Sequence, residues 1–286
     1  MPVTVPGAAM GETAAMVIPI HDDNPVRRTP IVTYLLIVVN IVVFIFLEPV
    51  HSTLLGDTGS ATQVCSQVRF FDEYAAIPRE LLNDEPLPPH AYAIEPSDGG
   101  RFVCRSSFPD KNPVVSVLYA MFLHGGWLHL LGNMLFLFIF GNNIEDRLGR
   151  VRYLLFYVFA GYAATYGFAL ANADSTTTLV GASGAIAGVL GAYLILFPRA
   201  RVRTLIPIGF IFIWPRLPAW LVLGGWFALQ YWYSTGGGVT SAAGVAYLAH
   251  VVGFLVGVIV AMLVRGFSRR PSYPSYSSYR PQRYYR

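Results

Sequence analysis

The chain has 286 residues, of which 54% are hydrophobic and 13% are charged, and its formal net charge is +4. Ordinary soluble domains carry about 25% charged residues, so this composition excludes a soluble enzyme with a large core. It indicates a membrane protein with several spanning helices. All but one of the 20 basic residues are arginines, which we interpret as a genome bias and not as a nucleic-acid-binding pattern.

Residues 1–29 form a polar segment that four prolines interrupt. No basic start followed by an apolar run and a cleavage site is present, so we expect a flexible cytoplasmic segment without a removable signal peptide. The first apolar run, 31–47, follows Arg27 and Arg28. This order predicts a first spanning helix whose basic end lies in the cytoplasm.

A long loop, predicted to be extracytoplasmic, follows over residues 48–126 and holds the only two cysteines, Cys65 and Cys104. An oxidising compartment would favour a disulfide between them, but two cysteines in a loop leave unpaired thiols equally open. No CxxC pattern is present, so we expect no zinc site. Near the end of the loop, the apolar piece 114–123 is too short to span a membrane and stops before two glycines, which favours an interfacial segment.

Five further apolar runs predict spanning helices at about 127–143, 153–171, 179–197, 217–233 and 243–264. Residues 204–216 contain two prolines and are interpreted as a connector at the membrane surface. The tail 266–286 has low complexity and is predicted to be disordered. With both termini in the cytoplasm, 15 of the 20 basic residues lie on the cytoplasmic side. This asymmetry is what the positive-inside rule expects for an even number of spans with both termini in the cytoplasm. We expect a multi-pass protein of the plasma membrane.

The fourth run contains a serine that is followed by very small residues. Gly184, Gly188 and Gly191 recur at spacings of three and four after Ser183. On a helix they form one stripe, along which another helix could approach to backbone contact. A serine in such a stripe usually hydrogen-bonds within its own helix, so packing alone would also explain Ser183.

Polar residues also occur in the second and sixth runs. His129 and Asn133 are four residues apart and share a helix face, and His250 lies in the sixth run. Ionisable side chains inside a span are costly, so a functional role is the first hypothesis. The alternative is an interhelical hydrogen bond worth ~0.6 kcal/mol. The predicted topology places these groups and Ser183 in the outer half of the bilayer, where they could meet.

Together these patterns resemble the rhomboid family of intramembrane serine proteases. The resemblance rests on His124-Gly-Gly-Trp-Leu-His129-Leu-Leu-Gly-Asn133, Glu145-Asp-Arg147, Gly181-Ala-Ser183-Gly184 and His250-Val-Val-Gly253-Phe-Leu-Val-Gly257. It covers residues 30–265. It implies an all-α membrane protein, a six-transmembrane-helix bundle with the long loop between spans one and two.

The resemblance also implies the chemistry, a serine endopeptidase with a Ser-His dyad and no cofactor. Ser183 would be the nucleophile and His250 the general base. The backbone N–H of Ser183 and the side chains of His129 and Asn133 would form the oxyanion hole. The chain departs from the family at Ala187, where many members carry an aromatic side chain that packs on the catalytic histidine. Other contacts must therefore hold His250.

The expected substrates follow from the depth of Ser183. A serine about one turn below the outer surface can attack only a helix that unwinds there, so we expect single-span membrane proteins with small or helix-breaking residues at that end. They would enter past Trp226 and Phe227. Membrane lipids are the other expected partners, and neither a metal nor a nucleic acid is expected. Two alternatives stay open: a rhomboid-like protein that binds membrane clients without cleaving them, and a transporter with a proton or ion site.

Overall fold

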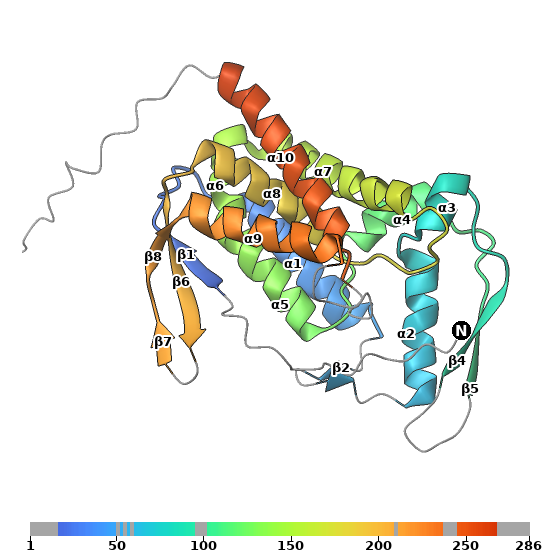
Figure 1. Cartoon of the computed structure of the whole chain (residues 1–286). Coiled ribbons are helices and arrows are strands. Elements are labelled where there is room, and N and C mark those ends of the chain that lie inside the picture. The colour runs from blue at the N-terminus through green and yellow to red at the C-terminus, as the bar shows by residue number, and fades with distance from the viewer. Residues whose placement is uncertain are drawn as a thin grey trace, which may run out of the picture.

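The computed structural model describes residues 17–49, 52–53, 56–57, 60–94, 102–208, 211–236 and 245–267. The expectations for residues 1–16, for the start of the sixth span at Ala243 and for the tail 268–286 lie outside the described residues. The described part is mostly helical, with a small sheet on one side of the helix bundle and a disulfide-linked unit on the other (Figure 1). The bundle helices are α1 (Ile31–Phe46), α5 (Trp127–Phe136), η1 (Leu137–Gly141), α6 (Asn142–Leu148), α7 (Arg150–Ala171), α8 (Ser183–Leu196), α9 (Ala219–Ser234) and α10 (Tyr247–Phe267).

Among the described residues, three helical stretches are long and apolar enough to cross a membrane. They are Trp127–Leu148, Arg150–Ala171 and Tyr247–Arg265. The first continues from α5 into α6 through the π-helical turn η1. Two shorter apolar helices, α1 and α8, accompany them. The count of six spans therefore stays a prediction.

Helix α8 lies in the centre of the bundle and contacts α7, α10 and η1 (Figure 1). Its side chains Ile186, Val189, Leu190 and Tyr193 are buried, so almost no face of α8 is left for solvent or lipid. The small residues between them let the neighbouring helices approach closely. The core of the molecule therefore surrounds the helix that Ser183 begins.

The predicted helix over 179–197 is wrong at its start. The helix begins at Ser183 and has 14 residues, which corresponds to about 21 Å. The preceding residues are held by hydrogen bonds to other segments, because Leu179 N–H donates to Ala76 O and Gly181 N–H donates to Ala120 O. Gly181 has a φ of +118°, a conformation that favours glycine and that an α-helix cannot contain. Ser183 therefore lies in the first turn of α8 and not one turn inside it.

Four strands form an antiparallel sheet beside the bundle (Figure 1). Strand β6 (Arg201–Ile208) pairs with β1 (Ile18–Asp22), β7 (Ile211–Ile213) and β8 (Arg216–Pro218). The connector expected at residues 204–216 therefore contains strands, and its place at the membrane surface stays a prediction. Residues 18–22 of the N-terminal segment, which we expected to be flexible, form β1 and pair with β6.

Strand β1 is tied to the bundle by Asp22, a buried carboxyl. Its Oδ2 accepts hydrogen bonds from the hydroxyl of Tyr193 on α8 and from Nδ2 of Asn143 on α6, both at 2.7 Å. Burial raises the pKa of Asp22 to about 6. The sheet is thus linked directly to the helix of Ser183.

The long segment between α1 and α5 contains regular structure. It comprises β2 (Ser52–Thr53), β3 (Gly56–Asp57), α2 (Ala61–Tyr74), α3 (Pro78–Asn83), β4 (His90–Ile94), β5 (Phe102–Ser106) and α4 (Pro113–Ala120). Strands β4 and β5 form a hairpin. Helix α4 occupies the short apolar piece, and Asn112 caps it by accepting a hydrogen bond from Val115 N–H.

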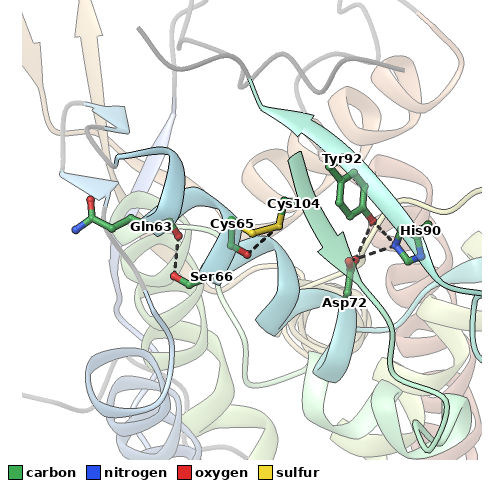
Figure 2. Close-up of a disulfide and its surroundings, with 7 residues drawn as sticks. All are labelled: Gln63, Cys65, Ser66, Asp72, His90, Tyr92 and Cys104. Atoms are coloured by element: carbon green, nitrogen blue, oxygen red, sulfur yellow. Dashed lines mark hydrogen bonds and ion pairs between the residues drawn. A yellow bond between two sulfur atoms is a disulfide. The ribbon is translucent and has the colours of Figure 1, made fainter. Parts of the chain in front are cut away.

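Cys65 on α2 and Cys104 on β5 form a disulfide, which joins the helix to the hairpin (Figure 2). Close by, Asp72 accepts a hydrogen bond from Tyr92 and lies 3.4 Å from His90 (Figure 2). These contacts hold α2 against both strands. Ala76, which lies between α2 and α3, pairs with Leu179, four residues before Ser183.

Candidate active site

Ser183 lies at the N-terminal end of α8, directly after the turn at Gly181. A Cβ at Gly181 would lie 2.8 Å from the ring of His129 and 3.6 Å from Ser183 Oγ. Only glycine fits between these two side chains, because both the φ angle and the available space exclude a larger residue. The turn therefore brings the serine hydroxyl near His129 and leaves it half-buried.

His250 on α10 contacts the serine directly. Its Nε2 lies 2.8 Å from Ser183 Oγ, within hydrogen-bond distance. Its other ring nitrogen, Nδ1, lies 2.7 Å from Oε1 of Gln230 on α9. The imidazole thus bridges two helices, and the structure brings together the predicted nucleophile and the predicted base.

The approach of α8 and α10 depends on glycines from both helices. A Cβ at Gly257 would collide with the carbonyl oxygen of Gly188, and a Cβ at Gly253 would collide with that of Gly184. A Cβ at Gly191 would collide with the carbonyl of Phe254. The predicted stripe therefore faces α10. Its first members also face α7, because Cβ atoms at Gly184 and Gly188 would lie 2.7 Å from Ala164 and Ala160.

His129 on α5 faces the turn before Ser183. Its Nδ1 accepts a hydrogen bond from Gly125 N–H at 3.4 Å, so the ring proton of the neutral side chain belongs on Nε2. His129 Nε2 is one of the two ring atoms that a Cβ at Gly181 would meet at 2.8 Å. His129 therefore holds an N–H donor beside the serine turn.

Asn133 lies one turn further along α5. Its side chain is 7% exposed, and Nδ2 is buried without a hydrogen-bond partner among the described residues. A buried amide donor without a partner costs about 1–3 kcal/mol, so folded proteins usually pair such a donor with a protein group, a water or a ligand. Asn133 thus carries a donor that is free for a ligand.

The loop before α5 holds His129 in place. The backbone N–H of His124 donates to the Glu48 carboxyl at 3.0 and 3.1 Å, and the ring of His124 packs edge-on against His129, with centroids 5.2 Å apart. Burial raises the pKa of Glu48 to about 8 and lowers that of His124 to about 3. Both groups are therefore mostly uncharged at neutral pH.

The family model for the Rhomboid domain matches residues 111–267, more than half of the chain. The chain belongs to the rhomboid family. The matched region contains Ser183, His250, His129 and Asn133, and the glycines between α8 and α10. Members of this family are typically serine proteases.

Several curated rhomboid proteins are similar to this chain. RHOMBOID-like protein 5 of Arabidopsis thaliana is 37% identical over 78 residues, which are 27% of this chain and 25% of that protein. Rhomboid-like protein 11, chloroplastic, of the same plant is 29% identical over 148 residues, 52% of this chain and 51% of the relative. Rhomboid protein 1, mitochondrial, of Saccharomyces cerevisiae is 28% identical over 151 residues, 51% of this chain and 40% of the relative. The chain thus spans between a quarter and about half of the length of these relatives.

In this rhomboid, the two aromatic residues expected at the substrate entrance lie on α9 and face α10. The Trp226 ring lies 6.0 Å from the His250 ring and 6.1 Å from the Phe254 ring, measured between centroids. Phe227 stacks on Phe254 at 4.6 Å. Trp226 is therefore a neighbour of the imidazole as well as a residue at the α9–α10 boundary.

Two residues at this rhomboid site were missed in the sequence analysis, Gln230 and Glu48. Gln230 is a polar residue inside an apolar run, four residues after Trp226, and that isolation was the available signal. Glu48 ends the first apolar run and was interpreted only as its boundary. Its contact with His124 crosses 76 residues of sequence, which no local pattern predicts.

Proposed function

We propose that this rhomboid is an intramembrane serine endopeptidase that uses Ser183 as nucleophile and His250 as general base. The observation that carries the proposal is the 2.8 Å hydrogen bond between Ser183 Oγ and His250 Nε2. A serine hydroxyl is a weak nucleophile unless an adjacent base accepts its proton. A protein that bound membrane clients without cleaving them would not need this pair.

In the first step, Ser183 Oγ attacks the carbonyl carbon of the scissile peptide bond while its proton moves to His250 Nε2. The resulting oxyanion would accept hydrogen bonds from the Ser183 backbone N–H, from His129 Nε2 and from Asn133 Nδ2. The unpartnered Nδ2 of Asn133 supports this assignment. Each preorganised donor in such a site contributes about 2.7–4 kcal/mol to the barrier reduction.

The protonated His250 then gives its proton to the leaving amine, and the C–N bond breaks to leave an acyl ester on Ser183. Water attacks this ester with His250 again acting as base, and the second product leaves with a free carboxyl group. All these proton transfers pass through one nitrogen, Nε2. A Ser-His pair therefore suffices for both halves of the reaction.

The proposed substrates are single-span membrane proteins with Gly, Ala, Ser or Pro near the extracytoplasmic end of the span. A peptide bond in an intact helix is shielded by its own hydrogen bonds, so the segment must unwind before Ser183 can reach it. The arginine asymmetry supports an orientation with both termini in the cytoplasm, and the plasma membrane is the proposed location.

The test is cleavage of a panel of such substrates by the purified protein in liposomes, with the cut sites mapped by mass spectrometry. We expect cuts near the outer end of the substrate span, and none with Ser183→Ala. The Ser183→Ala protein should keep its melting temperature, which separates lost chemistry from lost folding. Cuts only in soluble loops, or cleavage by the Ser183→Ala protein, would contradict the proposal.

A further inference from the structure

Gln230 holds the side of His250 that faces away from the serine. Its side chain is 9% exposed, and its Oε1 lies 2.7 Å from His250 Nδ1. The carboxamide is oriented with Oε1, which can only accept a hydrogen bond, toward Nδ1, and in this orientation Nδ1 carries the ring proton. The opposite nitrogen, Nε2, then presents its lone pair to the hydroxyl of Ser183. The contact with Gln230 therefore selects the tautomer that can act as a base.

A neutral amide in this place differs from the carboxylate of a Ser-His-Asp triad. The described hydrogen-bond partners of the His250 ring are Ser183 and Gln230, both uncharged. Burial in a low-dielectric environment costs an ionised carboxylate much solvation free energy, whereas it costs an amide far less. Gln230 thus orients the ring without adding a charge to the interior of the helix bundle.

Helix α9 also supplies the ring that packs beside His250. Trp226 lies one turn before Gln230 and on the same face of α9, with its ring centroid 6.0 Å from that of His250. Ala187 on α8 is buried and carries only a methyl group. The hydrogen bond to Nδ1 and the nearest flanking ring therefore both come from α9, and Tyr247 on α10 adds an edge-on ring with its centroid 6.3 Å away.

We propose that Gln230 is a positioning residue of the dyad, which fixes the tautomer and the orientation of His250. This inference rests on the proposed function, because it assigns Gln230 a role in the same reaction. Gln230 contacts the imidazole at Nδ1, on the side away from the reacting Nε2, and would act through the ring. Loss of its carbonyl oxygen should lower the rate of the chemical step and leave substrate binding unchanged.

The test compares Gln230→Leu, Gln230→Glu and the wild-type protein in liposomes, with the exposed neighbour variant Leu229→Met as matched control. We expect Gln230→Leu to lower kcat about 10- to 100-fold, the range found when the hydrogen-bond partner of a metal-bound histidine is removed, with KM within about twofold. Gln230→Glu keeps an acceptor oxygen and should restore most of kcat. A kcat of Gln230→Leu equal to that of wild type, or equal losses in Gln230→Leu and Gln230→Glu, would overturn the proposal.

A second measurement needs no variant at position 230. Nitrogen NMR of ¹⁵N-histidine-labelled wild-type protein, with the His250 signals identified by their absence in His250→Ala, should show Nδ1 protonated and Nε2 unprotonated. The opposite tautomer would overturn the proposal even if Gln230→Leu failed to fold. Absence of cleavage by folded wild-type protein would instead contradict the proposed function, and the tautomer would still test Gln230.

Discussion

The two helix contacts on either side of His250 are built in opposite ways. Between α8 and α10, glycines let backbone meet backbone, and even a methyl group at Gly257 would collide with a carbonyl oxygen. Between α9 and α10, large side chains fill the space, with Phe227 stacked on Phe254 and Trp226 beside the imidazole. Cβ atoms at Gly224 and Gly225 on α9 would meet nothing within 4 Å.

This difference separates two requirements of the dyad. The α8–α10 contact sets the distance between Ser183 and His250, because backbone atoms already in contact cannot move closer and any added atom forces the helices apart. The α9–α10 contact sets the orientation of the imidazole through Gln230 and Trp226, whose side chains can adjust. We therefore expect changes in the glycine contact to act more severely than changes on α9.

The largest effect is expected from Gly257→Ala, compared with the identical change Gly225→Ala. The new methyl group at position 257 must displace α8 from α10, and a misplacement of about 1 Å can cost ~100-fold in rate. At position 225 the methyl group enters open space, and alanine favours the helix by up to ~1 kcal/mol. Initial cleavage rates in liposomes measure both. Equal activity of the two variants would mean that the glycine contact does not set the dyad distance.

A smaller effect is expected from Trp226→Ala, compared with Trp232→Ala on the same helix. Loss of an aromatic neighbour worth about 0.5–1.5 kcal/mol predicts up to a tenfold lower kcat. Trp232 is 61% exposed, and its removal should leave kcat unchanged. A steady-state analysis of substrate cleavage separates kcat from KM. If Trp226 only obstructs the substrate entrance, Trp226→Ala would raise the turnover or change KM alone, contrary to this prediction.

The smallest effect on catalysis is expected at Asp22, which contacts α8 near its far end. Because burial raises the pKa of Asp22 to about 6, the folded protein binds this proton more tightly than the unfolded chain, whose pKa is about 4. Stability should therefore fall as the pH rises from about 4 to 6, by on the order of 3 kcal/mol from this group. Asp22→Asn should flatten the melting temperature over this range, with cleavage near wild type. An unchanged pH dependence in Asp22→Asn would show that Asp22 does not titrate there.

Parts of the fold were predictable because their signals are local. Apolar runs predicted the bundle helices, and the spacing of small residues after Ser183 predicted a helix contact through glycines. The strands β1 and β6 were missed because their pairing joins residues about 180 positions apart, such as Ile18 and Leu205. No pattern within either segment specifies such a partner.

The start of α8 was mispredicted for a related reason. Residues 179–182 are apolar and small, which suits a helix, but hydrogen bonds to Ala76 and Ala120 hold them in another conformation. Tertiary contacts here override the local preference. At the site, Ser183 and His250 were predicted as partners from their surrounding motifs, whereas Gln230 was missed because a single polar residue in a helix does not reveal what it contacts.

The most direct test of whether His250 activates Ser183 is reaction of the purified protein with a small fluorophosphonate, followed by peptide mass spectrometry. An activated serine forms a covalent adduct with this reagent, and an ordinary serine does not. We expect one adduct, on Ser183, in the wild-type protein, and its loss in a folded His250→Ala variant. Absence of an adduct on folded wild-type protein, or equal labelling of Ser183 without His250, would contradict the claim that His250 activates Ser183.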